Sequence, residues 1–262
     1  MTATAAAPLV FITGASSGIG QALAARYASL GWRLALVARR VELIEQWALA
    51  NGLDPARLRA YGADIAQPEQ IIAAARRCME ELGLPEVVIA NAGISVGMDT
   101  RHREDLEVMR ETYAVNNVGL AATFHAFVEP MRHRKSGTLV GIASVAAIRG
   151  FPGHGAYCSS KAAVVSYCES LRVECRGTGV RVVTLLPGYV ATPLTARNRY
   201  PMPFLISAEA FAERAQRAID AGASRRVIPW QMGWVARGLR LLPAPLFDKL
   251  FARRGRKHRR GE

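Results

Sequence analysis

The stretch LVFITGASSGIG, residues 9–20, decides the fold of this chain. Its first four residues are apolar and predict a buried strand, and the glycine-rich string after them predicts a tight turn. Glycines at positions 14, 18 and 20 permit positive φ and a close approach of the backbone to a pyrophosphate. A helix that follows would add free N–H groups and the positive end of its dipole. A plain turn explains a lone glycine triplet, but the whole string after an apolar run predicts a dinucleotide site.

Outward from this turn, strand-like runs alternate with helical segments, which predicts a parallel sheet covered on both faces. No composition break occurs before residue 230, so we assign 1–230 to one domain, which carries the predicted dinucleotide site, and 231–262 to an amphipathic extension with a basic tail. Strands are expected near 9–13, 33–38, 57–61, 86–90, 138–142, 180–186 and 226–229. Helices are expected near 18–30, 40–50, 68–82, 103–114, 115–134, 156–177 and 208–221.

The chain has 262 residues, half of them hydrophobic, and a formal net charge of +13. The length suits one sizeable α/β domain, and the basic balance attracts phosphates, nucleic acid or anionic lipid. No apolar run reaches roughly 18 residues and no basic residue precedes Arg26, so we expect neither a membrane span nor a secretory signal. The four cysteines are Cys78, Cys158, Cys168 and Cys175, with no CxxC pair. Cys168 and Cys175 would lie on one helix, about 10 Å apart, which is too far for a disulfide. We therefore expect a reducing, cytoplasmic location and no structural metal site.

Tyr157 and Lys161 form the most informative chemical pair in the sequence. Positions i and i+4 of a helix share one face, about 5–6 Å apart. A lysine ammonium there favours the phenolate form of the tyrosine, which makes the phenol a usable general acid/base near neutral pH. Most pairs at this spacing are solvated helix faces. Ser144, thirteen residues upstream after a strand-like run, and the glycine turn strengthen the catalytic interpretation.

Together these motifs resemble the short-chain dehydrogenase/reductase family, over roughly residues 8–230. The resemblance implies a single-domain Rossmann fold, a doubly wound seven-stranded parallel sheet with helices on both faces. It also implies hydride transfer between a nicotinamide cofactor and a small-molecule carbonyl or secondary alcohol. By the same resemblance the protein is expected to be a homodimer or homotetramer, with helices near 103–134 and 156–177 at the interface.

The resemblance implies four catalytic residues. Tyr157 transfers the proton, Lys161 lowers the pKa of that tyrosine and binds the ribose, and Ser144 polarises the substrate oxygen. Asn116 kinks a helix and links Lys161 to water, with Asn117 as its rival by one position.

The resemblance also implies a set of cofactor-binding residues along the ends of the strands. Asp64 has a common alternative as a cap or loop aspartate, and Pro187-Gly188 as a plain turn. The family often has a second asparagine where this chain has Ala90. The implied cofactor residues are Gly14, Ser16, Ser17, Gly18, Ile19, Gly20, Arg39, Asp64, Ile65, Asn91, Ala92, Gly93, Tyr157, Lys161, Pro187, Gly188, Val190 and Thr192.

The end of the second strand, Ala38-Arg39-Arg40, indicates which cofactor binds. An NAD site usually has a carboxylate here for the ribose 2′-hydroxyl, which Ala38 cannot supply. The planar guanidinium of Arg39 suits a 2′-phosphate, and Ser17 can add a hydrogen bond. Alternatively, Arg39 and Arg40 only solvate the start of the next helix. We expect NADP(H) rather than NAD(H), with Arg39 as the main contact.

A proline-containing segment, residues 193–207, is expected to form a lid over the substrate. Candidates to line the substrate pocket, each equally compatible with ordinary packing, are Phe151, His154, Tyr189, Tyr200 and Phe204.

Beyond residue 230 an apolar series interleaves with basic residues, and Pro243 and Pro245 split it into two short amphipathic segments. One interpretation is packing over the pocket or at an oligomer interface, followed by a disordered basic tail. The other is a peripheral membrane anchor on anionic lipid, which would suit a lipid-like substrate.

Two other functions are alternatives to the enzyme. A non-catalytic NADP(H)-sensing protein needs only the nucleotide half of the site, so the four catalytic residues disfavour it. The charge suggests a nucleic-acid binder, but no recognition motif of that class is present, so we expect no specific nucleic acid.

Overall fold

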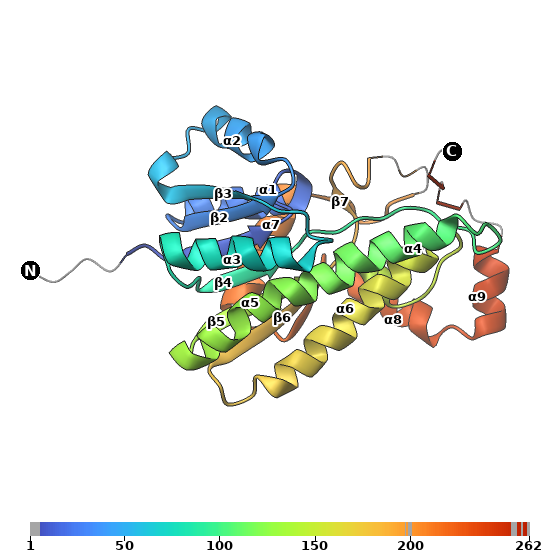
Figure 1. Ribbon diagram of the computed structural model, residues 1–262. Coiled ribbons are helices and arrows are strands. Elements are labelled where there is room, and N and C mark those ends of the chain that lie inside the picture. The colour runs from blue at the N-terminus through green and yellow to red at the C-terminus, as the bar shows by residue number, and fades with distance from the viewer. Residues whose placement is uncertain (1–5, 197, 199–200, 253–255, 258, 261–262) are drawn as a thin grey trace, which may run out of the picture.

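The computed structural model describes residues 6–196, 198, 201–252, 256–257 and 259–260. Seven parallel strands form one sheet in the order β3-β2-β1-β4-β5-β6-β9 (Figure 1). The predicted seven-stranded sheet is confirmed, and each predicted strand boundary lies within one residue of the observed boundary. The strands are β1 (Leu9–Thr13), β2 (Arg33–Ala38), β3 (Leu58–Gly62), β4 (Val87–Ala90), β5 (Gly137–Ile142), β6 (Val180–Pro187) and β9 (Arg225–Ile228).

Helices cover both faces of the sheet, as a doubly wound fold requires (Figure 1). Because both faces of the sheet centre are buried, the central strands β1 and β4 are nearly continuous apolar runs, and no residue of β1 is more than 1% exposed. One face is covered by α1 (Gly18–Ser29), α2 (Val41–Ala50) and α7 (Ala208–Asp220), and the other by α3 (Pro68–Leu82), α5 (Gly119–Arg134) and α6 (Gly155–Glu174).

The strand order reverses at β1, which pairs with β2 on one side and with β4 on the other. At such a reversal the loops that leave the two halves of the sheet diverge and open a crevice at the carboxyl ends of the strands. The glycine turn after β1 and Asn91 after β4 therefore face the same crevice.

Two local features go beyond the predicted elements. A π-helical turn, Ala114–Val118, joins α4 (Asp105–Tyr113) to α5 where the sequence analysis placed a simple helix boundary. A second, two-stranded sheet pairs β7 (Val190–Ala191) with β8 (Ile206–Ser207), which ties the loop after β6 to the start of α7. Two-residue strands are too short to give a periodic sequence pattern.

The two apolar segments near the C-terminus are helices α8 (Gln231–Leu241) and α9 (Ala244–Phe251). Their inner sides are buried at Met232, Ala236 and Phe247. Arg149 joins the pair to the main fold, because its guanidinium donates to the carbonyl oxygens of Leu239 and Leu242, at 3.0 and 2.9 Å. The inner sides thus pack on the protein, while the outer sides stay exposed.

All four cysteines are free and buried. Among the described residues, no helix combines the length and the apolar character needed to cross a membrane. In the same part of the chain, no group of three or more His, Cys, Asp and Glu side chains is placed to hold a metal ion.

Candidate active site

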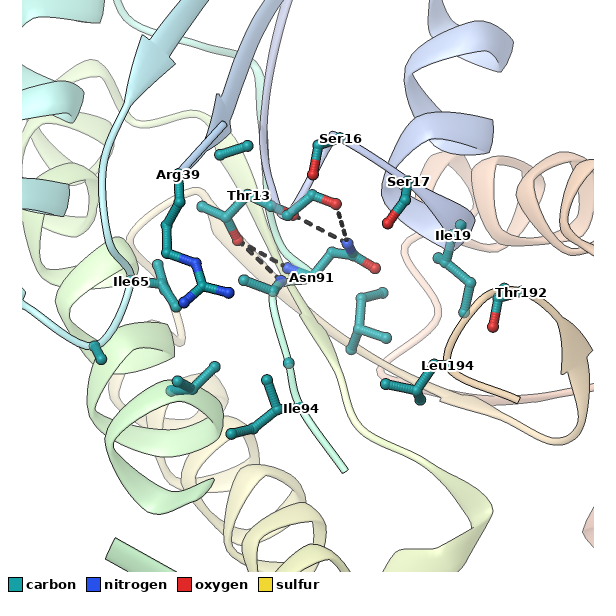
Figure 2. Close-up of a pocket in the computed structure, with 18 of the residues that line it drawn as sticks. Thr13, Ser16, Ser17, Ile19, Arg39, Ile65, Asn91, Ile94, Thr192 and Leu194 are labelled. Atoms are coloured by element: carbon teal, nitrogen blue, oxygen red, sulfur yellow. Dashed lines mark hydrogen bonds between the residues drawn. The ribbon is translucent and has the colours of Figure 1, made fainter. Parts of the chain in front are cut away.

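A cavity of about 870 Å³ lies at the carboxyl ends of the central strands, and Figure 2 shows part of its lining. All the predicted site residues line it except Gly20 and Asn116. Those in the lining are Gly14, Ser16, Ser17, Gly18, Ile19, Arg39, Asp64, Ile65, Asn91, Ala92, Gly93, Ser144, Tyr157, Lys161, Pro187, Gly188, Val190 and Thr192.

The turn after β1 needs glycine for two different reasons. Gly14 and Gly18 have φ of +67° and +57°, a region that glycine enters without strain. Gly20 is limited by space instead, because an added Cβ would lie 2.2 Å from the Gly14 carbonyl oxygen and 2.6 Å from Asn91 Nδ2. A Cβ on Gly14 would lie 2.8 Å from Ala92 Cα. The turn is therefore pressed against the end of β4.

Thr13 and Asn91 hold this contact together (Figure 2). Thr13 Oγ1 accepts hydrogen bonds from the backbone N–H groups of Asn91 and Ala92, at 3.1 and 3.2 Å. In return, Asn91 Nδ2 donates to the carbonyl oxygens of Thr13 and Gly14, at 3.0 and 3.3 Å. The sequence analysis did not include Thr13 among the site residues.

The N-terminus of α1 opens into the cavity. Ser17 is its N-cap residue, but its side chain makes no capping hydrogen bond. The first N–H groups of a helix lack partners within the helix, so this end favours an anion. Figure 2 shows the hydroxyl-bearing side chains of Ser16, Ser17 and Thr192 in the lining. Thr192 comes close to the turn, since a Cβ on Gly18 would lie 3.3 Å from its Cβ.

Arg39 extends from the end of β2 into the cavity, on the same side as Ile65 and opposite Thr192 (Figure 2). Asp64 lines the cavity and also holds its own loop, because its Oδ1 accepts a hydrogen bond from the backbone N–H of Ala66 at 3.0 Å. Asp64 therefore has the structural role of a loop aspartate, which was one of the two interpretations of this residue from the sequence.

Ser144, Tyr157 and Lys161 lie together in the lining of the cavity. Ser144 follows β5, and its Oγ accepts a hydrogen bond from the backbone N–H of Ala146 at 3.1 Å. Tyr157 on α6 hydrogen-bonds the side chain of Ser144. Lys161, one turn further along α6, is only 4% exposed, and its Nζ donates to the carbonyl oxygen of Ile142 at 2.9 Å.

Burial controls the protonation of this group. It raises the pKa of the Tyr157 phenol above its ordinary value, an effect that the hydrogen bond with Ser144 opposes. It also lowers the pKa of Lys161 from its ordinary 10.5 to about 8. The sequence analysis expects Lys161 to lower the pKa of Tyr157. In this geometry the net shift is upward, because desolvation dominates and the ammonium, 6.0 Å from the tyrosine ring centroid, is bound to a carbonyl.

Asn116 does not line the cavity, but it hydrogen-bonds the backbone of Ile94, which does. Its Oδ1 accepts from the backbone N–H of Ile94 at 2.9 Å, and its Nδ2 donates to Ser160 Oγ at 2.9 Å. A Cβ on Gly93 would lie 3.1 Å from Asn116 Oδ1 and 3.3 Å from Lys161 Nζ. Gly93 therefore lets Asn116 and Lys161 approach the same stretch of backbone. The sequence analysis did not identify Ser160, although it lies between the two residues of the Tyr157–Lys161 pair.

The π-helical turn also determines what Asn117, the alternative to Asn116 in the sequence analysis, can reach. Asn117 points to α6 as well, where its Nδ2 donates to the carbonyl oxygen of Ser160 at 2.9 Å. Asn116 alone of the two reaches the backbone beside Lys161, through its bonds to Ile94.

Residues 193–195 of the expected lid line the cavity. The aromatic and histidine candidates do not: none of Phe151, His154, Tyr189 and Phe204 is in the lining, and Tyr200 lies outside the described residues. Phe151 instead packs on α9, with its ring centroid 5.9 Å from that of Phe247.

The basic tail contributes a residue that the sequence analysis missed. Lys257 Nζ donates to Ser95 Oγ at 2.6 Å and lies 5.9 Å from the ring centroid of Tyr157. The expectation of a disordered tail is wrong for residues 256–257 and 259–260, which form specific contacts.

A sequence model of the family described as short chain dehydrogenase matches residues 8–202. An uncharacterized oxidoreductase of Myxococcus xanthus is 39% identical over 242 residues, which cover 90% of this chain and 93% of that protein.

Solved structures agree with the fold. A short-chain dehydrogenase/reductase from Burkholderia phymatum in complex with NAD has a TM-score of 0.80 and 24% identity, covering 88% of this chain and 92% of that chain. A short-chain dehydrogenase from Sphingobium yanoikuyae in complex with NADPH has a TM-score of 0.74 and 26% identity, covering 88% and 94%.

Proposed function

The chain belongs to the short-chain dehydrogenase/reductase family, and on that premise we propose that it is an NADP(H)-dependent oxidoreductase. It transfers hydride between the nicotinamide and the carbonyl or secondary alcohol carbon of a small-molecule substrate. One observation carries this proposal: Ser144, Tyr157 and Lys161 share a single cavity with the glycine turn.

The residues around the cavity fit a nicotinamide dinucleotide. The turn at Gly14 and Gly20 has no room for a side chain, and the N-terminus of α1 offers free N–H groups to a pyrophosphate. Lys161 would hold ribose hydroxyls, and the backbone at Val190 would hold the carboxamide. When bound, the nicotinamide supplies or accepts the hydride.

The chain's own residues handle the proton. The raised pKa of Tyr157 keeps its phenol protonated near neutral pH, so it can give a proton to a carbonyl oxygen. Ser144, which hydrogen-bonds Tyr157, would donate to the same oxygen and orient it. After transfer, the nearby Lys161 ammonium stabilises the phenolate. A protonated phenol is the form of Tyr157 that carbonyl reduction requires.

Arg39 supports NADP(H) over NAD(H). Its guanidinium extends into the cavity from the end of β2, where Ala38 offers no carboxylate to a ribose hydroxyl. A guanidinium can bind a 2′-phosphate through two parallel hydrogen bonds.

We also propose that the protein is a homo-oligomer whose subunits meet through α4, α5 and α6. Large apolar side chains stay exposed on α4, on α6 and on the π-helical turn before α5, and burial against a second copy would remove them from water. They are Leu106, Met109, Val118, Tyr167 and Val173.

The C-terminal extension, residues 231–262, together with Trp230, forms the surface that we propose to contact anionic lipid. Trp230 and Trp234 are 65% and 62% exposed on the outer side of α8. Arg237 lies 4.9 Å from the ring centroid of Trp234, so apolar and basic groups alternate as at a lipid boundary. Arg240 and Lys249 add exposed positive charge beside them.

Replacing Tyr157→Phe removes the phenolic proton and keeps the ring. We expect kcat for NADPH-dependent carbonyl reduction to fall by at least about 100-fold, since a general acid contributes 10²–10⁴-fold. The measurement is steady-state turnover over a panel of ketones, aldehydes and long-chain acyl carbonyls, with circular dichroism to show that the variant folds. A folded variant with substantial activity would contradict the role of Tyr157. No wild-type turnover despite tight NADPH binding would favour a sensor.

Replacing Arg39→Gln removes the proposed charge on the 2′-phosphate. We expect the dissociation constant for NADPH to rise about 10- to 100-fold, because a hydrogen bond to a charged group contributes about 1.5–3 kcal/mol. The dissociation constant for NADH should not change. Arg40→Gln is the matched control, and calorimetric titration measures the dissociation constants of the wild type and both variants for both cofactors. Equal affinity of the wild type for NADPH and NADH would refute the preference.

Replacing Val173→Glu places a charge on the exposed side of α6. We expect light scattering to show a dimer or tetramer for the wild type and a smaller species for this variant, because burying an unpaired charge opposes association. Leu49→Glu, on the exposed side of α2, should leave the mass unchanged. A monomeric wild type would rule the proposed interface out.

Replacing both Trp230→Ser and Trp234→Ser removes the apolar part of the proposed lipid-contacting surface. We expect the wild type to cosediment with phosphatidylglycerol vesicles at low salt and the double variant to do so several-fold less, since interfacial binding scales with buried apolar area. Leu49→Ser is the control for an exposed apolar residue elsewhere. If the wild type stays in the supernatant, the lipid proposal fails.

A further inference from the structure

Residues 256–257 and 259–260, near the C-terminus, lie against the loop after β4 and the loop before α6. We call residues 256, 257, 259 and 260 the C-terminal strap. Its backbone touches the main fold at two glycines. Arg259 forms a parallel β-bridge with Gly97, and a Cβ on Gly153 would lie 2.8 Å from the backbone nitrogen of Lys257. The strap is thus seated between the loop after β4 and the loop before α6.

Acidic residues on and before α4 fix the strap by its arginines. Arg259 Nε lies 2.7 Å from Asp105 Oδ2, and Asp105 is only 3% exposed. This contact holds the pKa of the Asp105 carboxyl below its usual range. Arg256 lies 3.0 Å from the buried Asp99. A buried carboxylate without a partner is unfavourable, so these ion pairs stabilise the contact between the strap and the main fold.

A third ion pair brings the strap to the cavity itself. Arg260 pairs with Glu111 on α4, and both residues line the cavity. The arginines of the strap that the structure describes are therefore all paired with carboxylates.

Lys257 differs from these arginines. Within the described part of the chain it has no carboxylate partner, and its ammonium donates to the hydroxyl of Ser95. It is partly buried, and burial lowers its pKa. Its Nζ lies 5.9 Å from the ring centroid of Tyr157, almost the same distance as the 6.0 Å of Lys161 Nζ. The tyrosine ring is thus approached by two ammonium groups.

The two ammonium groups differ in where they lie. Lys161 lines the cavity, whereas Lys257 and Ser95 lie at its edge, beside the lining residues Ile94 and Val96. Lys161 is buried and bound to the carbonyl oxygen of Ile142. Ser95 Oγ, by contrast, accepts a hydrogen bond from Lys257, which leaves its own proton available for another acceptor. A partly buried ammonium without a counter-ion is unfavourable, and an incoming anion would offset that cost.

We propose that Lys257 and Ser95 bind an anionic group of the substrate, a carboxylate, sulfonate or phosphate, while Tyr157 meets its carbonyl or alcohol oxygen. The substrate class is therefore oxo acids and their hydroxy acids. The inference rests on the proposed oxidoreductase function. It makes Lys257 a residue that determines specificity, carried to the site by the strap.

The test compares charged and neutral substrates of the same shape. NADPH-dependent reduction of 3-oxobutanoate, 4-oxopentanoate, 5-oxohexanoate and 6-oxoheptanoate is measured beside that of their methyl esters. The wild type should prefer one acid over its ester by at least about tenfold in kcat/KM, since a charge-assisted hydrogen bond contributes that much. The chain length with the largest preference reports the spacing between Tyr157 and Lys257.

The variant Lys257→Gln keeps a donor for Ser95 and removes the charge. We expect kcat/KM for the preferred acid to fall about 10- to 100-fold, mainly through KM, with values for the ester and KM for NADPH unchanged. Lys249→Gln, an exposed lysine on α9, is the matched control and should behave as the wild type. Equal losses for acid and ester, or a wild type without preference for any acid, would overturn the inference.

A binding measurement separates this inference from the proposed function. If no acid or ester is reduced, the proposed function fails, and calorimetric titration of pentanoate and pentanamide still tests the anion site, with and without NADP⁺. Binding of pentanoate but not pentanamide, weakened about tenfold or more by Lys257→Gln, supports the site. Equal binding of both compounds, or no effect of the variant, rejects it.

Discussion

The rest of the site depends on one close contact, in which the turn after β1 lies directly against the end of β4. Gly20 shows how little room exists, since an added Cβ would meet the Gly14 carbonyl oxygen at 2.2 Å. Thr13 Oγ1 fills the hydrogen-bonding needs of two consecutive N–H groups at the end of β4. With these atoms fixed, the N-terminus of α1 and the backbone at Gly93 both face the cavity. The proposed phosphate-binding groups and the backbone beside the proposed proton-transferring residues are therefore positioned by the same contact.

The chemical end of the cavity is built from buried charge. Lys161 loses water on α6 and recovers one hydrogen bond from the Ile142 carbonyl, which leaves its pKa depressed to about 8. The same burial disfavours a charged Tyr157. In such a low-dielectric site a new charge interacts strongly with its neighbours, so a phenolate formed by proton transfer gains more from Lys161 than it would in water. Burial thus holds the resting tyrosine protonated, and it also strengthens the attraction between Lys161 and a phenolate once that phenolate has formed.

Local sequence patterns were sufficient for the fold and for most of the lining. Strands buried on both faces are nearly continuous apolar runs, and β6 is recognisable from residues 180–186 although Arg181 is exposed. The glycine turn and the Tyr157–Lys161 spacing carry their own physical reasons. Sequence patterns did not predict the features that depend on tertiary packing. Phe151 is aromatic and close in sequence to Tyr157, yet its ring packs on Phe247 and Phe251 of α9. The pKa of Tyr157 depends on burial, which helix spacing does not reveal.

The contacts of the strap could not be predicted from the sequence, for a related reason. Lys257 and Ser95 are 162 residues apart, and Arg259 and Asp105 are 154 apart, so the tail alone shows only positive charge. The family model ends at residue 202, while the strap lies beyond it. The residues of the proposed proton transfer thus lie inside the matched part of the chain, while Lys257, one of the two residues of the proposed substrate contact, lies outside it. Relatives can keep Ser144, Tyr157 and Lys161 and still differ in what they reduce, which is why the fold predicts the reaction and does not predict the substrate.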